Sequence, residues 1–349
     1  MSYQIALLPG DGIGREVVPA AWAVLQATGL PAQAREWSLG WDCFQQTGAA
    51  LPAATLDAVR AADAALLGAV GSPSHRAPGY RSPVVALRQA LDLYACVRPV
   101  RTPPLERDHA QPNVDLVVIR ENSEGLYAGI EQRDGERATA LRVITASASA
   151  RITRWAVRYA RAHQRRRITI VHKANVLRET CGLFRETALD VLHAELTPAD
   201  RIEVDELLVD TAAYHLVRDP ERFDLILTTN MFGDILSDAA SAWGGGLGLA
   251  ASANFGERGA IFEPVHGSAP DIAGQGRANP LAAITAAALL LDHLGETERA
   301  ARVRAAVAAA LAQGIHTPDL GGSATTADMT EFVIDQVRRA HQPILESSR

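Results

Sequence analysis

The chain has 349 residues, of which 48% are hydrophobic and 21% charged, and its formal net charge is −6. This length predicts a large core and about two domains. The acidic balance argues against nucleic-acid binding, since such surfaces are usually basic. Three widely spaced cysteines without a Cys-x-x-Cys pair favour free thiols over a disulfide framework or a zinc site. No leader and no membrane-length apolar run is present, so we expect a cytoplasmic protein that does not enter a membrane.

Short β-rich runs alternate with helical stretches along the whole chain. Strands are predicted at 4–8, 64–70, 116–120, 168–172, 223–229 and 260–263. Helices are predicted at 16–27, 53–62, 83–91, 149–162, 184–195, 235–242, 280–294 and 296–312. This alternation predicts an α/β fold with functional residues at strand ends.

A glycine cluster, "LLPGDGIGREV" at 7–17, follows the first predicted strand. A dinucleotide fingerprint has glycine at its first, third and sixth positions. Here Arg15 occupies the sixth position, and no acidic residue ends a strand about twenty residues further on. The turn is therefore not a Rossmann fingerprint, and it also lacks the Gly-Lys-Ser/Thr of a phosphate loop.

Basic side chains come next along the chain, in "PVVALRQALDLYACVRPVR" and "VIRENSEGLY". These segments place Arg88, Arg98 and Arg120 near Tyr127 in sequence. A guanidinium binds a carboxylate in bidentate fashion, although an arginine taken alone is more often a solvated surface charge. Arg98 and Arg120 are expected at strand ends, which favours a site.

A lysine follows the buried-looking strand "ITIVH". Lys173 could act as a base with a lowered pKa, or it could be an ordinary exposed lysine, and Asn175 lies beside it. His172 and His266 lack the spaced partners of a zinc pair.

Carboxylates cluster in "FDLILTTNMFGDILSD". Asp234 and Asp238 are four residues apart at the expected start of a helix, so they face the same way. Such a pair could coordinate Mg²⁺ or Mn²⁺, or it could simply complement the helix dipole in the first turn. Asp210 ends another strand-like run and is a third candidate.

Seven motifs in order resemble one family. They are "GDGIG", "LDLYACVRP", "RENSEGLY", "HKANVL", "TTNMFGDILSD", "GGLGLA" and "FEPVHGSAPDIAGQGRANP". The chain thus resembles the metal-dependent decarboxylating β-hydroxyacid dehydrogenases, which include isocitrate, 3-isopropylmalate, homoisocitrate and tartrate dehydrogenases. The resemblance implies a two-domain, non-Rossmann α/β fold like that of isopropylmalate dehydrogenase. Residues 1–98 and 252–349 would form a discontinuous cofactor domain, and 99–251 the substrate, metal and dimerisation domain.

The resemblance also implies NAD as cofactor. The expected contacts are Ile13, Glu263, His266, Gly267, Ser268, Ala269, Asp271 and Asn279. Asp271 can accept hydrogen bonds from ribose hydroxyls but would repel a 2′-phosphate, which favours NAD over NADP.

Catalytic roles carry over motif by motif. Asp234 and Asp238, with Asp210 of a partner subunit, would bind Mg²⁺ or Mn²⁺. Lys173, also from the partner, would accept the hydroxyl proton, and Tyr127 would protonate the product carbon. Substrate carboxylates would meet Arg88, Arg98, Arg120 and Asn175. Because the partner subunit would supply Asp210 and Lys173, the resemblance implies a homodimer with shared active sites, or a tetramer built from it.

The segment before Arg88, "GSPSHRAPGYRSPVVALR", indicates the substrate. Its Ser72, Arg81, Val84 and Val85, together with "HKAN", look most like homoisocitrate dehydrogenase. Isocitrate, 3-isopropylmalate, tartrate, D-malate and another 3-substituted malate stay open. Arg81 could equally be a plain surface charge, and a non-catalytic regulatory subunit is a remote alternative.

Four positions depart from the family pattern. These are Cys96, Thr211, Tyr214 and His215. The changes around Tyr214 would lie near the subunit contact. Cys96 is either a buried inert thiol or one with a lowered pKa beside Arg98.

Overall fold

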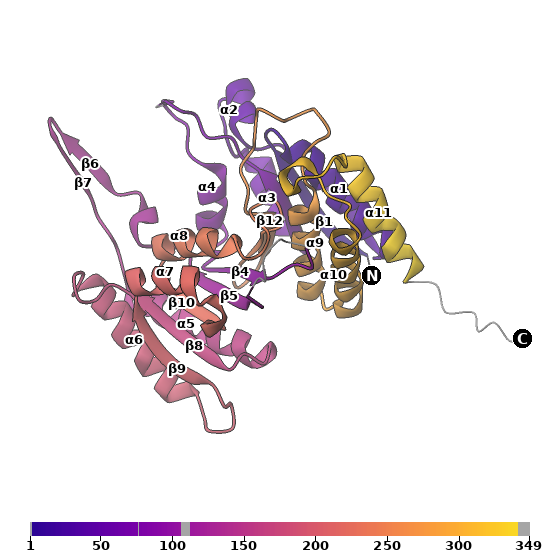
Figure 1. Cartoon of the computed structure of the whole chain (residues 1–349). Coiled ribbons are helices and arrows are strands. Elements are labelled where there is room, and N and C mark those ends of the chain that lie inside the picture. The colour runs from indigo at the N-terminus through magenta and orange to yellow at the C-terminus, as the bar shows by residue number, and fades with distance from the viewer. Residues whose placement is uncertain (1, 76, 106–111, 341–349) are drawn as a thin grey trace, which may run out of the picture.

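The computed structural model describes residues 2–75, 77–105 and 112–340 (Figure 1). The strands are β1 Tyr3–Gly10, β2 Ala32–Glu36, β3 Ala64–Ala69, β4 Ala95–Arg101, β5 Asp115–Glu121, β6 Glu131–Asp134, β7 Arg137–Ala140, β8 Arg167–His172, β9 Glu203–Leu208, β10 Leu225–Thr228, β11 Ala251–Phe255 and β12 Ala260–Pro264.

The helices alternate with these strands over most of the chain. The α-helices are α1 Gly14–Ala27, α2 Trp41–Thr47, α3 Ala53–Ala61, α4 Pro83–Ala90, α5 Ala146–Ala162, α6 Thr180–Glu195, α7 Val209–Arg218, α8 Asn230–Ser241, α9 Leu281–His293, α10 Thr297–Ala312 and α11 Thr326–Arg339. Short 3₁₀ turns are η1 Leu126–Ala128, η2 Pro220–Arg222 and η3 Pro318–Leu320. Within the described ranges, no helix has the length and apolar character that a bilayer span requires.

One sheet organises the molecule. Its ten strands have the order β2-β1-β3-β12-β11-β4-β5-β10-β8-β9. The strands at both ends of this order pair in parallel, whereas β11 pairs antiparallel with β12 and β4, and β4 pairs antiparallel with β5. The parallel strands of the two halves therefore run in opposite directions. This mixed α/β architecture is the predicted fold class.

Apolar clusters pack on both faces of each half of the sheet. Around β1, β3 and β12, helices α1, α9, α10 and α11 cover one face, while buried residues of α3 and α4 cover the other. Around β5, β8 and β10, helices α5 and α6 cover one face and α7 and α8 the other. In Figure 1, α1, α9, α10 and α11 form one group of helices, and α5 to α8 lie at the opposite side of the molecule. The proposed domain boundaries at 98/99 and 251/252 remain a prediction.

All six strands expected from the sequence are present, and so are all eight expected helices. The main difference in extent concerns α8, which begins at Asn230 rather than near residue 235. No range was predicted for the central strands β4 and β11, the edge strand β2, or helices α2, α7 and α11. The strand-like run expected before Asp210 is the edge strand β9, but it ends at Leu208, and Asp210 lies in α7.

A two-stranded hairpin, β6–β7, projects from the rest of the molecule (Figure 1). All of its strand residues are exposed. An isolated two-stranded hairpin is at best marginally stable in water, so this arm is a segment that gains from contact with another surface.

Candidate active site

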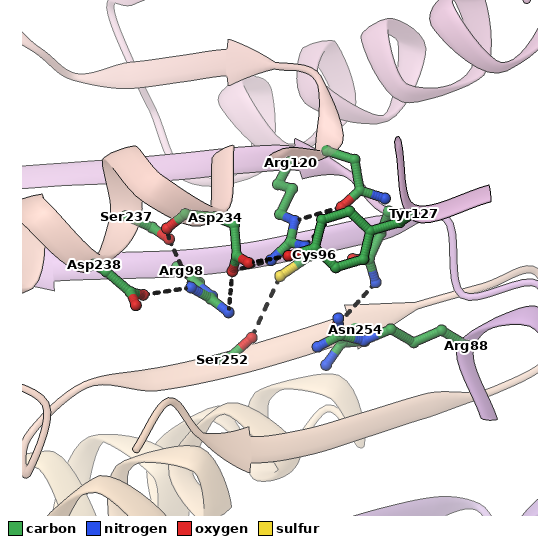
Figure 2. A network of polar contacts seen from close by, with 12 residues as sticks. Arg88, Cys96, Arg98, Arg120, Tyr127, Asp234, Ser237, Asp238, Ser252 and Asn254 are labelled. Carbon is green, nitrogen blue, oxygen red and sulfur yellow. Dashed lines mark hydrogen bonds and ion pairs between the residues drawn. The ribbon is translucent and has the colours of Figure 1, made fainter. Parts of the chain in front are cut away.

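Polar side chains occupy one face of the central strands (Figure 2). The apolar cluster that contains Leu87 of α4 lies toward one half of the sheet, and the cluster with residues of α7 and α8 lies toward the other. Asn254, Cys96 and Arg120 are direct neighbours across β11, β4 and β5. Directly paired residues point to the same face, as do residues two apart along a strand. The same face therefore also carries Arg98 and Ser252. Buried charge in the centre of a sheet is costly unless it is paired, which makes this face the candidate functional site.

The central contact is between two arginines and Asp234. The side chain of Arg120, only 1% exposed, bonds to Asp234 Oδ1, and Arg98 Nη2 lies 3.2 Å from the same oxygen. Arg98 Nη1 also donates to Asp238 Oδ1 at 2.8 Å and to Ser237 Oγ at 2.7 Å. The structure thus brings together four of the residues singled out in the sequence, two arginines and two carboxylates (Figure 2).

Tyr127 joins this cluster from η1. Its hydroxyl donates to Asp234 Oδ2, and the Arg120 guanidinium carbon lies 4.9 Å from the centre of its ring. Burial raises the pKa of Tyr127, and the hydrogen bond to Asp234 raises it further. The phenol is therefore protonated at neutral pH and can act as a proton donor.

Local sequence explains why Arg120 points into the site. Asn230, at the start of α8, accepts from Arg120 Nε at 3.0 Å and from Nη2 at 2.6 Å. A Cβ at Gly233 would lie 2.7 Å from the Arg120 side chain, so only glycine allows α8 to pass this close. Asn230 and Ser237 were not predicted as site residues, although both lie in the "TTNMFGDILSD" motif.

The two carboxylates of α8 respond differently to this environment. Burial opposes ionisation of Asp234, but the charge of Arg120, the Tyr127 hydroxyl and the other arginines outweigh it, so its pKa is lowered. Burial raises the pKa of Asp238, and the negative charge of Asp234 adds to this rise. A cation bound between the two carboxylates would relieve their repulsion.

Arg88 lies at the other side of the cluster. Its Nη2 donates to Glu263 Oε1 at 2.7 Å, and Asn254 Nδ2 donates to the same oxygen at 2.8 Å. Asn122 in turn donates to Asn254 Oδ1 at 3.0 Å. Among the residues that the structure describes, the buried Nε atoms of Arg88 and Arg98 have no hydrogen-bond partner. Two buried, unpaired guanidinium donors fit a site for a substrate with several carboxylates.

Two sequence-based expectations need correction here. Arg98 does not end a strand but lies at the centre of the seven-residue β4. Asp234 and Asp238 are not in the first turn of their helix, because α8 begins at Asn230. The helix-dipole explanation for this pair is therefore wrong, since the dipole acts within the first turn.

Lys173 and Asp210 form a separate pair. Lys173 follows β8 and its Nζ lies 2.5 Å from Oδ1 of Asp210, which is in the first turn of α7. In the described part of the chain, no three His, Cys, Asp or Glu side chains are grouped closely enough to bind a metal. One chain thus supplies two neighbouring carboxylates at α8, and its Asp210 does not join them.

Some of the expected cofactor residues lie together. The Ile13 backbone N–H donates to the Ser268 carbonyl at 2.9 Å, which joins the glycine turn to the "HGSAPDIAG" segment. A Cβ at Gly12, whose φ is +55°, would lie 2.0 Å from the same carbonyl oxygen. Ala269 adopts a φ of +38°, which is uncommon for a residue with a Cβ. This conformation is typical of a binding loop.

His266, Asp271 and Asn279 complete this region. Burial lowers the pKa of His266, and its Nε2 has no hydrogen-bond partner among the described residues. Asn279 Nδ2 donates to Asp319 Oδ2 at 3.0 Å. Asp271 and Gly267 are exposed. A neutral imidazole and a free carboxylate beside an open backbone loop fit an adenosine group, which offers ring nitrogens and ribose hydroxyls.

The expected substrate-selecting residues lie along the segment that leads into α4. Ser72 and Arg81 are exposed, and Val85 is half-buried. Val84 packs against the apolar cluster that contains Leu67 and Leu87. Asn175 is exposed in the loop after Lys173. Their contacts with a substrate stay predictions.

The four positions that depart from the family pattern differ in burial and in their contacts. Cys96 is fully buried, with its Sγ 3.4 Å from Ser252 Oγ (Figure 2). On α7, Tyr214 is 55% exposed, and His215 Nδ1 lies 2.7 Å from Asp219 Oδ1. Thr211, in the same helix, is half-buried.

The fold and the site together define an enzyme of the decarboxylating dehydrogenase class. The chain belongs to the isocitrate/isopropylmalate dehydrogenase family, whose sequence profile matches residues 4–333. It is 50% identical to an isocitrate/homoisocitrate dehydrogenase of Thermus thermophilus, over 97% of this chain and 99% of that protein. It is 45% identical to a 3-isopropylmalate dehydrogenase of Archaeoglobus fulgidus, over 95% and 98%. The crystal structure of an isocitrate dehydrogenase from Methylococcus capsulatus superposes with a TM-score of 0.90 at 45% identity, covering 96% of this chain and 99% of that one.

Proposed function

We propose that this enzyme catalyses the NAD-dependent oxidative decarboxylation of a 3-substituted (R)-malate, with homoisocitrate as its preferred substrate and 2-oxoadipate, CO₂ and NADH as products. The observation that carries the proposal is the buried cluster of Arg98, Arg120 and Tyr127 around Asp234, with Arg88 nearby. Its cations fit the malate carboxylates, and its phenol fits a proton donor.

The arginines of this cluster would bind and orient the substrate. Arg88 and Arg98 each have a buried Nε without a partner in the described structure. Each Nε–H can therefore donate to a substrate carboxylate without first breaking a hydrogen bond at that atom. Arg120 is fixed by Asn230 through two hydrogen bonds. A guanidinium held in this way binds a carboxylate with little further loss of side-chain entropy.

Asp234 and Asp238 would hold Mg²⁺ or Mn²⁺. Their carboxylate oxygens are the ligand type that these hard cations prefer. When bound, the cation would lower the pKa of the substrate hydroxyl and stabilise negative charge on that oxygen. Tyr127 would deliver its proton to the carbon that loses CO₂, and Lys173 would remove the hydroxyl proton.

NAD would accept the hydride beside the glycine turn. The supporting contacts are the junction between Ile13 and Ser268, the neutral His266 and the exposed carboxylate of Asp271. Because Asp271 would repel a 2′-phosphate, NAD is proposed over NADP.

A homodimer would complete each site. Asp210 and Lys173 pair with each other and not with Asp234, which fits donation of both residues to a neighbouring subunit. Large apolar side chains are also exposed around them. They are Val176 and Leu177 after β8, Tyr214 and Val217 on α7, and Met231 and Ile235 on α8. Burial of these side chains against a second copy would stabilise the dimer.

A substrate panel tests the proposal. Formation of NADH would be followed with Mg²⁺ and either NAD or NADP, using homoisocitrate, isocitrate, 3-isopropylmalate, D-malate and tartrate. We expect the highest kcat/KM with homoisocitrate and NAD. Turnover of the other substrates without homoisocitrate would move the assignment to another 3-substituted malate. No turnover of any of them would overturn the proposal.

Arg81 offers a sharper test of the preferred substrate. If it meets the distal carboxylate of homoisocitrate, Arg81→Ser should lower kcat/KM for that substrate by ~10-fold or more, as expected for one charge-assisted hydrogen bond. The kcat/KM for 3-isopropylmalate, which has no distal charge, should change little. Arg60→Ser, at another exposed arginine on α3, is the matched control. An equal loss on both substrates would show that Arg81 only supports the fold.

A further inference from the structure

Asp11, within the glycine turn, has no role in the chemistry described above. It is 4% exposed, and its carboxylate accepts three backbone N–H groups. Oδ2 accepts from Trp41 and from Gly71, each at 2.7 Å, and Oδ1 accepts from Asp42 at 3.0 Å. One buried carboxylate thus joins the end of β1, the first turn of α2 and the segment that follows β3.

The neighbouring glycine shows how closely this contact is built. A Cβ at Gly40, just before α2, would lie 2.4 Å from Asp11 Oδ2. Only glycine, which has no side chain, leaves room at position 40 for the Asp11 carboxylate. Hydrogen bonds between a carboxylate and backbone N–H groups are charge-assisted and stronger than neutral ones.

Tyr80 binds the same segment from the other side, at Gly71. Its hydroxyl donates to the Gly71 carbonyl at 2.9 Å. Its ring meets Trp41 edge to face, with centroids 5.2 Å apart, and Phe44 in the same way at 5.3 Å. Burial and the negative charge of Asp11 raise the pKa of Tyr80, so the hydroxyl stays protonated and remains a donor.

These contacts anchor the first residue of the segment 71–82. Its first residue, Gly71, is held through its N–H by Asp11 and through its carbonyl by Tyr80. The segment contains Ser72 and Arg81, and the structure describes all of it except residue 76. It then leads directly into α4, whose Arg88 is close enough to Asp234 to help lower the pKa of that carboxyl.

We propose that Asp11 and Tyr80 are positioning residues that set substrate selectivity by fixing Gly71, and with it the adjoining residues Ser72 and Arg81, beside the substituent of the substrate. This inference rests on the proposed function. Neither residue would touch the substrate. They would act by holding Ser72 and Arg81 where a distal carboxylate can meet them.

The expected effect differs between substrates for a physical reason. A hydrogen bond to a distal carboxylate depends on donor position and angle, so a looser segment weakens it. Apolar contact with an isopropyl group is not directional and tolerates the same movement. The malate carboxylates would bind to Arg88, Arg98 and Arg120, whose side chains are held by Glu263, Asp238 and Asn230 outside this segment, so kcat should be nearly unchanged.

The test compares Tyr80→Phe and Asp11→Asn with the wild-type enzyme. Tyr80→Phe removes one hydrogen bond and keeps the ring between Trp41 and Phe44. Asp11→Asn replaces one carboxylate oxygen by an NH₂ group, which donates but cannot accept a hydrogen bond. For each variant we expect kcat/KM for homoisocitrate to fall about 3- to 10-fold, the range of one net hydrogen bond, through a higher KM. The kcat/KM for 3-isopropylmalate should stay within about twofold.

Hydrogen exchange supplies a readout that does not depend on activity. Backbone amides in peptides covering 71–82 should exchange faster in both variants, whereas those of β5 should not. Tyr94→Phe is the matched control, because it removes a tyrosine hydroxyl that binds Glu257 at 2.9 Å, away from this segment. It should change neither the substrate ratio nor the exchange at 71–82.

Three outcomes are distinguishable. A lower homoisocitrate-to-isopropylmalate ratio with faster exchange at 71–82 supports the proposal. An unchanged ratio, or an equal loss on both substrates, overturns it even if exchange is faster. If the wild-type enzyme turns over no 3-substituted malate, the proposed function fails and this inference fails with it.

Discussion

Replacement of Asp234 by asparagine should abolish turnover. Asp234 lies between Arg98, Arg120 and the Tyr127 hydroxyl, and it is one of two α8 carboxylates proposed to hold the divalent cation. The amide side chain of the Asp234→Asn variant would keep the shape of the carboxylate but lose its charge. We expect kcat to fall by ~10³-fold or more, since a catalytic cation supplies several kcal/mol of charge stabilisation. The measurement is NADH formation at saturating substrate and Mg²⁺.

The cofactor gives the internal control for this variant. The cation would act on the substrate, so binding of NADH, followed by its fluorescence, should stay close to wild type in Asp234→Asn. Asp57→Asn removes a carboxylate paired with Arg60 on the exposed surface of α3, and it should retain full activity. Undiminished turnover by Asp234→Asn, or by the wild type in excess chelator, would refute the metal assignment.

Activity restored by mixing two inactive variants is the second large effect that we expect. Tyr127→Phe and Lys173→Ala should each be inactive or nearly so, because the first lacks the proton donor and the second the base. If Lys173 acts in the partner's site, one of the two sites in a mixed dimer has both residues intact. Random reassembly of equal amounts should then give about a quarter of wild-type activity.

A second mixture, which cannot form an intact site, is the control for this experiment. Mixing Tyr127→Phe with a chain that carries both substitutions leaves no site with an intact Tyr127, and it should restore nothing. Subunits with different affinity tags would show that mixed dimers form. Mixed dimers that form but stay inactive would show that each chain uses its own Lys173, consistent with a site contained in one subunit.

The sequence predicted the parts of the sheet whose side chains follow a simple pattern. Strands such as β1 and β8 are buried apolar runs followed by turn or helix signals, and both were found. By contrast, β4 reads "ACVRPVR", in which a buried arginine and a proline interrupt the apolar pattern. Arg98 faces the site, so function overrides the pattern there. The edge strand β2, "AQARE", was missed because none of its residues is fully buried, so it lacks an apolar run.

For the candidate site too, the sequence predicted only some of the residues. Motifs identified the charged residues around Asp234, because each has a chemical role that a family resemblance carries over. They did not identify the residues that orient those charges. Asn230, which fixes Arg120, and Asn254, which shares Glu263 with Arg88, are distant in sequence from the arginines they serve. Such contacts follow from the pairing of β11 with β12 and from the place of α8 after β10, beside β5, which the local sequence does not encode.

The contacts of Asp234 with Arg98 and Arg120 make ligand binding a competition between anions. A substrate carboxylate that binds Arg98 Nη2 or Arg120 Nη1 must displace Asp234 from those atoms, so there it gains only the difference between two ion pairs. On the proposed mechanism, a divalent cation held by Asp234 and Asp238 would draw Asp234 away from the arginines and free those N–H groups. Cation and substrate would then be thermodynamically linked, and each should lower the dissociation constant of the other by the same factor.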